Sequence, residues 1–212
     1  MNTYKNRLII TALFSCAMAY LESAVVVYLR IQYYPGGFHF PLVDIPIPIL
    51  LIEIGREVAT IIMIWSVAKL ISKSRQECFA FFIYIFAIWD ICYYLWLKLF
   101  IDWPGSLLEW DVLFLIPVPW IGPVLAPVIV SLSFILTAYL ILKYEYKNKR
   151  IPLTKKDWML EIGAGLIIVF TFFWETGTSI SKGIPQYYPW WLFIATMILG
   201  LFVFFRRLHK IR

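Results

Sequence analysis

The chain has 212 residues, 62% of them hydrophobic and 15% charged, and its mean hydropathy is +0.79. About a quarter of the residues of a soluble domain are charged, so this composition excludes an ordinary soluble protein and indicates an integral membrane protein. The net charge of +6 comes from basic residues that flank apolar segments, so it gives no reason to expect a nucleic-acid partner.

Six apolar segments follow one another along the chain, and most reach the roughly 20 residues that a helix needs to cross a bilayer. They cover residues 8–29, 47–71, 78–100, 112–142, 158–178 and 189–205. Apolar and polar residues do not alternate in ten-residue units, as they do in an outer-membrane barrel. We therefore predict a single all-α domain over residues 1–212, a polytopic transmembrane bundle of about six helices.

The first segment has two interpretations. Its basic start, its apolar run and the small residues Ala17-Met18-Ala19 are typical of a signal peptide with a cleavage site. The apolar run continues to Leu29, which favours an uncleaved helix. The charge pattern of the later segments is the same in both cases, so the sequence leaves cleavage open.

The fourth segment contains four prolines within eleven residues, at Pro117, Pro119, Pro123 and Pro127. A regular helix through all of them is implausible, because proline removes a backbone donor and clashes with the preceding turn. We predict a broken or re-entrant start near 112–123, followed by a regular helix to about residue 142. The alternative is a continuous helix kinked by its prolines.

Lysine and arginine are unevenly distributed between the two sets of segment ends. Three lie at one set, Arg30, Lys98 and Lys182, and fifteen lie at the other. The fifteen are Lys5, Arg7, Lys69, Lys73, Arg75, Lys143, Lys147, Lys149, Arg150, Lys155, Lys156, Arg206, Arg207, Lys210 and Arg212. We expect a protein of the bacterial inner membrane, in contact with bilayer lipid, and the positive-inside rule predicts that both of its termini lie in the cytoplasm.

Most ionisable residues within the apolar segments fall in the outer half of their predicted helices. Such groups cost several kcal/mol in hydrocarbon unless they are paired, hydrated or neutralised, so their convergence at one depth indicates a site. In the second segment, Glu53, Arg56 and Glu57 have the i, i+3, i+4 spacing that places them on one helix face. The candidate polar cluster consists of Glu22, Glu53, Arg56, Glu57, Asp90, Tyr94, Asp111 and Glu175.

Three roles stay open for this cluster. Arg56 could hold the helices in register through a buried ion network, the carboxyls could form a proton or cation pathway, or they could act as general acid and base. Asp90 and Tyr94 are four residues apart and could form a hydrogen bond within one helix. Asp111 precedes the proline-rich stretch, where it could cap the start of a helix.

The sequence offers little support for metal or cofactor chemistry. The two histidines, His39 and His209, do not belong to an E-x-x-H or H-x-x-x-H motif. The three cysteines, Cys16, Cys78 and Cys92, lack C-x-x-C spacing and are interpreted as buried apolar residues. No phosphate-binding loop or nucleophile motif is present. We expect no metal site and no cofactor, and the sequence assigns no catalytic residue.

Three stretches carry a resemblance to a known group. They are Gly55-Arg56-Glu57-Val58-Ala59-Thr60, Trp89-Asp90-Ile91-Cys92-Tyr93-Tyr94, and the stretch from Trp110-Asp111 to Pro119-Trp120. Together they resemble an uncharacterised group of bacterial multi-pass membrane proteins, over about half of the chain. The resemblance implies a membrane protein and no particular activity.

Three functions are compatible with these features. The leading hypothesis is a small proton- or cation-coupled transporter-like protein with a carboxylate-rich cavity in the outer half of the membrane. The second is an integral-membrane enzyme that acts on a lipid or isoprenoid substrate. The third is a non-catalytic subunit whose charges pair with a membrane protein partner or with a second copy of the chain. The substrate, the ion and the oligomeric state are not specified by the sequence.

Overall fold

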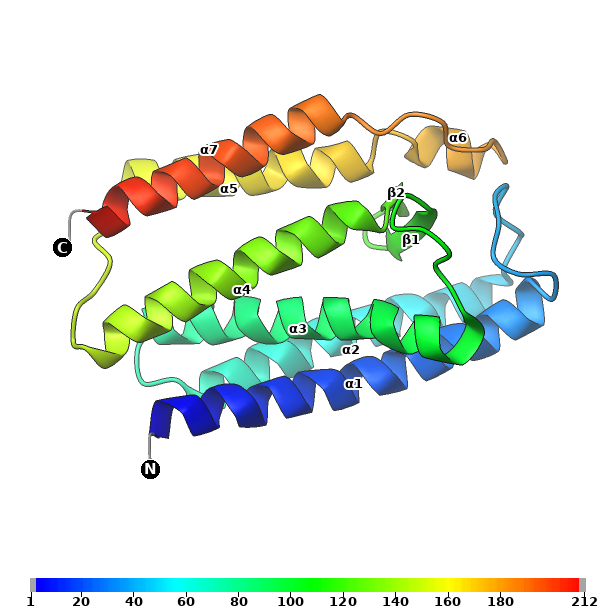
Figure 1. Ribbon diagram of the computed structural model, residues 1–212. Helices are drawn as coiled ribbons and strands as arrows, with labels where there is room; N and C mark the ends of the chain where they lie inside the picture. The colour runs from blue at the N-terminus through cyan, green and yellow to red at the C-terminus, as the bar shows by residue number, and fades with distance from the viewer. Residues whose placement is uncertain (1–2, 210–212) are drawn as a thin grey trace.

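The structure is a computed structural model that describes residues 3–209, and it is the predicted helical bundle (Figure 1). The elements in chain order are α1 (Thr3–Tyr33), α2 (Ile47–Ile71), α3 (Arg75–Ile101), β1 (Trp110–Phe114), β2 (Trp120–Pro123), α4 (Leu125–Tyr146), α5 (Lys155–Phe172), α6 (Thr176–Ile180) and α7 (Trp190–Leu208).

Five stretches of the described chain are helices long and apolar enough to cross a membrane, at Lys5–Tyr33, Arg75–Ile101, Leu125–Tyr146, Lys155–Ile180 and Trp190–Leu208. The protein is therefore a multi-pass membrane protein. Helix α2 also has 25 residues, but Glu53, Arg56 and Glu57 lower its apolarity. These three charged residues belong to the candidate functional site.

The fourth segment begins as a β-hairpin. Strands β1 and β2 pair antiparallel, with Trp110 opposite Pro123 and Asp111 opposite Gly122. Pro117 and Pro119 lie in the connection between the strands, and Pro127 lies in the first turn of α4, where the missing N–H costs no helical hydrogen bond. The predicted break in the helix is thus a hairpin, and α4 starts at Leu125 rather than at residue 112. No proline lies in the interior of α4, where it would produce a kink.

The fifth predicted helix is also interrupted. Helix α5 ends at Phe172, and the short helix α6 follows, so the segment predicted at 158–178 is two helices. Glu175 occupies the N-cap position of α6. This residue consequently lies in the turn between α5 and α6, within the candidate span Lys155–Ile180.

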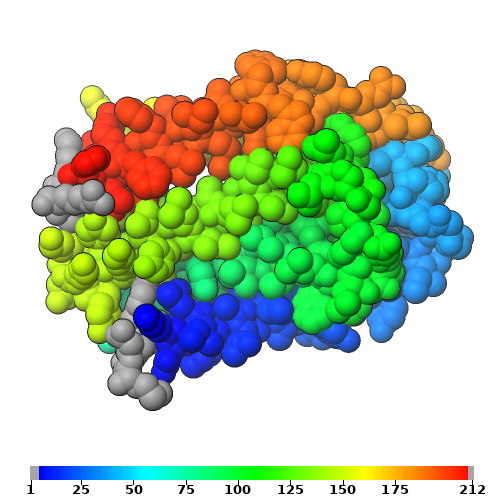
Figure 2. Space-filling view, viewed as in Figure 1, coloured from blue at the N-terminus to red at the C-terminus, as the bar shows by residue number. Residues whose placement is uncertain are grey.

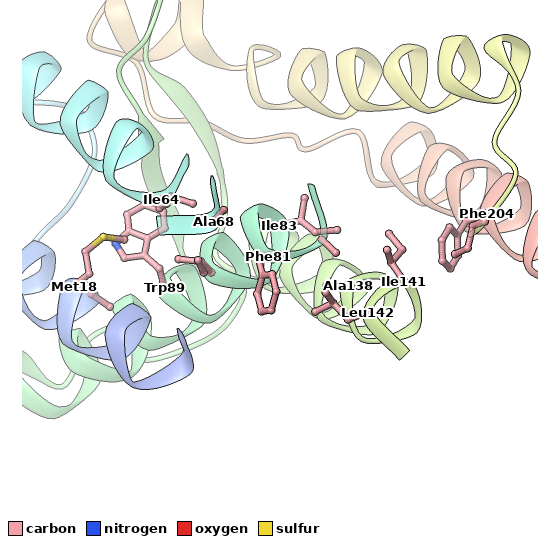
Figure 3. Close-up of a cluster of buried hydrophobic side chains, with 14 of the residues drawn as sticks. Met18, Ile64, Ala68, Phe81, Ile83, Trp89, Ala138, Ile141, Leu142 and Phe204 are labelled. Atoms are coloured by element: carbon pink, nitrogen blue, oxygen red, sulfur yellow. The ribbon is translucent and has the colours of Figure 1, made fainter. Parts of the chain in front are cut away.

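The helices form two packing units. Helix α3 packs against α1, α2 and α4, whereas α5 packs chiefly against α7, and Figure 1 shows α5 and α7 as a separate layer beside α4. The main buried core lies within the first unit, with Phe81 of α3 and Ile64 of α2 fully buried. Phe204 of α7 reaches the same core from the second unit (Figure 3).

The hairpin joins the two units at one end of the molecule. Gly122 of β2 lies so close to the Phe172 ring of α5 that a Cβ at position 122 would be 2.8 Å from a ring carbon. The Thr176 hydroxyl donates a hydrogen bond to the Pro119 carbonyl oxygen at 2.6 Å. We call this the hairpin end. Both described ends of the chain lie at the opposite, terminal end (Figure 1).

Ion pairs fasten the helices at the terminal end. Thr154 and Asp157 form a capping box at the start of α5. The fully buried Asp157 carboxylate also accepts from Arg206 Nη2 of α7 at 2.9 Å and forms an ion pair with Arg207 Nε at 2.7 Å. These contacts fasten α5 to α7 at the terminal end.

Candidate functional site

A cavity of about 680 Å³ lies between the two packing units. It is lined by all the long helices, by the hairpin and by the loop after α1. Figure 2 shows a narrow opening between α4 and α7 on one face of the molecule. A volume of this size falls within the range of about 300 to 1,000 Å³ that is usual for ligand pockets.

Seven of the eight residues of the candidate polar cluster line this cavity. They are Glu22, Glu53, Arg56, Glu57, Asp90, Tyr94 and Asp111. The eighth, Glu175, does not, because its carboxylate accepts a hydrogen bond from the Tyr187 N–H at 3.1 Å in the connection to α7. The depth argument from the sequence thus brings together residues of α1, α2, α3 and the hairpin, and only the residue at the α5–α6 break stands apart.

Arg56 is held between two carboxylates on neighbouring helices. Its Nε donates to Glu53 Oε2 on the same helix face at 2.8 Å, and its Nη2 forms an ion pair with the same oxygen at 2.7 Å. Its Nη1 forms an ion pair with Glu22 of α1, which also accepts from the Thr60 hydroxyl at 3.3 Å. This network connects α1 to α2, as expected if Arg56 holds the helices in register through buried ion pairs. Glu57 does not belong to the network.

Glu57 points instead to the hairpin. Both of its carboxylate oxygens accept from the Leu115 N–H, at 2.9 and 3.0 Å. Leu115 follows the last residue of β1, so this backbone N–H is not used by a strand partner. The carboxylate therefore supplies an acceptor that a turn at membrane depth would otherwise lack.

Asp111 differs from the sequence-based expectation. It lies in β1 and caps no helix, so the predicted N-cap is wrong. Its carboxylate accepts from Arg30 Nη2 at 3.1 Å and from the Tyr94 hydroxyl at 3.3 Å. The hydrogen bond expected between Asp90 and Tyr94 is not formed, because Tyr94 bonds to Asp111 and Asp90 accepts from the Ser131 hydroxyl of α4 at 2.7 Å.

The sequence did not single out Arg30, Tyr93 or Ser131. Tyr93 lines the cavity, and its ring meets the Tyr94 ring edge to face at 5.0 Å. Arg30 is separated from Asp111 by 81 residues, and nothing in its local sequence indicates that partner. The one signal in the sequence is that Arg30 is among the three basic residues at the less basic set of segment ends, in the last turn of α1.

Carboxyl groups outnumber cations around the cavity. Among the described residues, the lining contains Glu22, Glu53, Glu57, Asp90, Asp111 and Glu161, but only two cations, Arg30 and Arg56. Glu57 and Asp90 form no ion pair in the described part of the chain, and their partners are a backbone N–H and a hydroxyl. A buried carboxylate without a cation is costly, so these two groups are available to hold a proton or to accept a ligand's donor.

No set of three or more potential metal-ligating side chains from His, Cys, Asp and Glu occurs among residues 3–209. The two acids nearest to Arg56 are already engaged by its guanidinium.

The rest of the cavity is mainly apolar, with Glu161 of α5 as its charged residue, and it opens sideways. Toward the terminal end its lining includes Phe79 of α3, with 40% of its surface exposed, and Trp158 and Ile162 of α5, with 36% and 59% exposed. The Phe79 and Trp158 rings meet edge to face at 5.6 Å. Exposed apolar residues at this depth face hydrocarbon, so the cavity communicates with the bilayer interior.

The cavity is long enough for a lipid chain. Tyr94 at its polar end and Phe79 at its apolar end are fifteen residues apart on the same helix, which corresponds to about 22 Å at the rise of an α-helix. One leaflet contributes about 15 Å of the hydrocarbon thickness. A single acyl or isoprenoid chain can therefore lie along the cavity with its polar end at the carboxylates.

The loop after α1 covers the polar end. The Tyr34 hydroxyl accepts a hydrogen bond from the Val43 N–H at 3.1 Å, and both residues line the cavity. Burial raises the pKa of the Tyr34 phenol above its ordinary value, which Arg30 opposes only in part, so the phenol stays neutral at physiological pH. The cover is thus fixed by a bond that ordinary pH changes do not break.

Comparisons with protein-family models, with curated proteins and with solved structures find no match to this chain. The interpretation of the site consequently rests on its own geometry.

Proposed function

We propose that this protein binds one amphiphilic lipid or isoprenoid molecule in the cavity, with the apolar chain between the two helix layers and the polar end among the carboxylates and arginines. The observation that carries the proposal is the shape and polarity of one continuous cavity. Most of its charged residues gather at the hairpin end, the rest of its length is mainly apolar apart from Glu161 of α5, and its side opens where Phe79, Trp158 and Ile162 are exposed.

Binding of a chain at this place has a clear physical basis. Each methylene group contributes about 0.8 kcal/mol when it moves from water to an apolar site, although a chain that enters from the bilayer gains less, because lipid is itself apolar. A preference for this ligand over the bulk lipids of the membrane must then come from contacts to its polar end. The carboxylates that lack a cation supply the hydrogen-bond acceptors for this recognition.

The orientation follows from the charges. The basic residues of the larger set that the structure describes, from Lys5 to Arg207, cluster at the terminal end, and by the positive-inside rule this end is cytoplasmic. We therefore place the protein in a bacterial inner membrane with both termini in the cytoplasm and with the hairpin end toward the outer leaflet. A lipid of the outer leaflet then reaches the polar end with its own polar group at matching depth.

A second function, proton-coupled transport, is supported by one observation. Glu57 and Asp90 have no cation partner among the described residues, and carboxyls of this kind at membrane depth are typical of proton relays. In that case the same cavity carries its cargo between leaflets. In the lipid-modifying alternative, the same two carboxyls act as general acid and base on the polar end.

Native mass spectrometry of the full chain, gently extracted from its source membrane, tests the proposal. We expect one tightly held lipid or isoprenoid per chain, released on harsher delipidation. A chain that leaves the membrane empty would contradict lipid binding and favour the transport of a small ion. A stoichiometric protein partner in place of a lipid would instead support the subunit hypothesis.

A further inference from the structure

Arg30 has a hydrogen-bond donor without a partner at the polar end of the cavity. Only 8% of its surface is exposed, and it lines the cavity. Its Nη2 bonds to Asp111, but the buried Nη1 has no hydrogen-bond partner within residues 3–209. An unsatisfied buried donor is rare in proteins, and such a group calls for an acceptor from outside the chain.

The Arg30 guanidinium is held firmly in this position. Its central carbon lies 3.7 Å from the centre of the Trp103 ring and 4.5 Å from that of Phe38. Cation–π contacts of this kind cover the faces of the guanidinium, so an acceptor can reach it only at its edge, where Nη1 is the nitrogen without a partner. Asp111 and the two rings therefore hold this donor at the polar end of the cavity, and the indole N–H of Trp89 is a second buried donor of the lining without a partner among residues 3–209.

The charge around this donor determines which acceptor fits. Arg30 is already neutralised by Asp111, Arg56 is shared between two carboxylates, and Glu57 and Asp90 have no cation among the described residues. An additional anion in this cavity would be repelled by each of these carboxyls that is ionised. A hydroxyl group avoids the repulsion, because it accepts one hydrogen bond and donates another.

We infer that the polar end of the ligand is an uncharged, hydroxyl-bearing group that accepts from Arg30 Nη1 and donates to a carboxylate without a cation, and that lipids with an anionic headgroup are excluded. The inference rests on the proposed lipid-binding function. It assigns Arg30 a role in specificity, and it names the class of substrate as neutral lipid alcohols, such as acylglycerols or polyisoprenols.

Three ligands with the same oleoyl chain test this inference on the delipidated full-length protein. They are monooleoylglycerol, which is neutral and bears hydroxyls, oleoyl lysophosphatidic acid, which is anionic, and methyl oleate, which has no hydroxyl. Dissociation constants are measured by titration under native mass spectrometry. We expect monooleoylglycerol to bind at least about tenfold more tightly than either of the other two, the factor that one hydrogen bond to a charged group supplies.

The variant Arg30→Lys probes the donor itself. Lysine keeps a cation for Asp111, but it lacks the second terminal nitrogen of the guanidinium fork, so we expect about a tenfold loss of monooleoylglycerol affinity. Binding of methyl oleate should be unchanged, which also shows that the variant is folded. Arg75→Met, at an exposed site outside the cavity lining, is the control and should bind all three ligands like the wild type.

The outcomes separate the inference from the function on which it rests. If none of the three ligands binds, lipid binding itself is wrong. If lysophosphatidic acid binds as tightly as monooleoylglycerol, the protein binds lipid but does not exclude anions, and the inference fails. If Arg30→Lys binds monooleoylglycerol like the wild type, Nη1 is satisfied by water and does not contact the ligand, and the inference fails as well.

Discussion

Two glycines of α5 offer a direct test of the cavity. Gly165 lines the cavity, Gly163 does not, and a Cβ added at either position would meet no atom within 4 Å. Both substitutions also replace a glycine inside a helix, so they improve helix propensity by similar amounts. Gly165→Phe should therefore fill part of the cavity, whereas Gly163→Phe leaves it open.

The expected effect can be worked out from the ligand volume that is displaced. If the phenyl ring introduced by Gly165→Phe takes the place of about four methylene groups, the loss is roughly 3 kcal/mol at about 0.8 kcal/mol each, or about a hundredfold in affinity. Partial readjustment of the chain would reduce this figure but not abolish it.

The assay is the dissociation constant of an oleoyl-chain ligand for the two variants and for the wild type. Thermal unfolding measured beside it confirms that both variants fold. We expect weakened binding in Gly165→Phe alone. Wild-type affinity in Gly165→Phe, or an equal loss in Gly163→Phe, would show that the ligand does not lie between the helix layers.

Two further substitutions test how the fold is held together. Gly122→Ala brings a Cβ within 2.8 Å of the Phe172 ring. Such overpacking should lower the free energy of unfolding by about 1 to 3 kcal/mol and therefore lower the unfolding temperature. An unchanged temperature would mean that the hairpin does not pack on α5. Asp157→Asn should also lower the unfolding temperature, because the carboxylate is bound by two arginines that would lose their counter-charge. Asp90→Asn is its matched control, because the amide oxygen still accepts from Ser131 and no ion pair is broken. A similar fall of the unfolding temperature in both variants would refute the account of the ion pairs.

Much of the fold could be predicted from hydropathy alone. A segment of about 20 apolar residues has few alternatives to a membrane-spanning helix, and the second and third helices end within a few residues of the predicted positions, at Ile71 and Ile101. The fourth segment shows the limit of this reasoning. Its prolines indicate where a helix must break, but the pairing of β1 with β2 depends on contacts that proline spacing does not specify.

The membrane depth of the site residues could be predicted from the sequence, but their hydrogen-bond and ion-pair partners could not. Helix length and orientation placed Glu22, Glu53 and Asp90 at one level, because each residue of a helix advances by a fixed rise. Which carboxylate would bond Arg56, and which would bond a backbone N–H, depends on helix rotation and on a hairpin far away in the sequence. Arg30 was missed for the same reason, since its partner Asp111 is 81 residues distant.

A photoactivatable lipid provides the most direct test of lipid binding in the cavity. A neutral lipid alcohol with a diazirine in its acyl chain is added to membranes that contain the protein, and the crosslinked residues are identified by mass spectrometry. We predict labels on cavity residues such as Phe86, Ile168 and Met197, in excess over outward-facing residues such as Leu160 and Leu166, which are exposed and outside the lining. Labels confined to the outward faces would mean that lipid surrounds the protein but does not enter it, and would contradict the account.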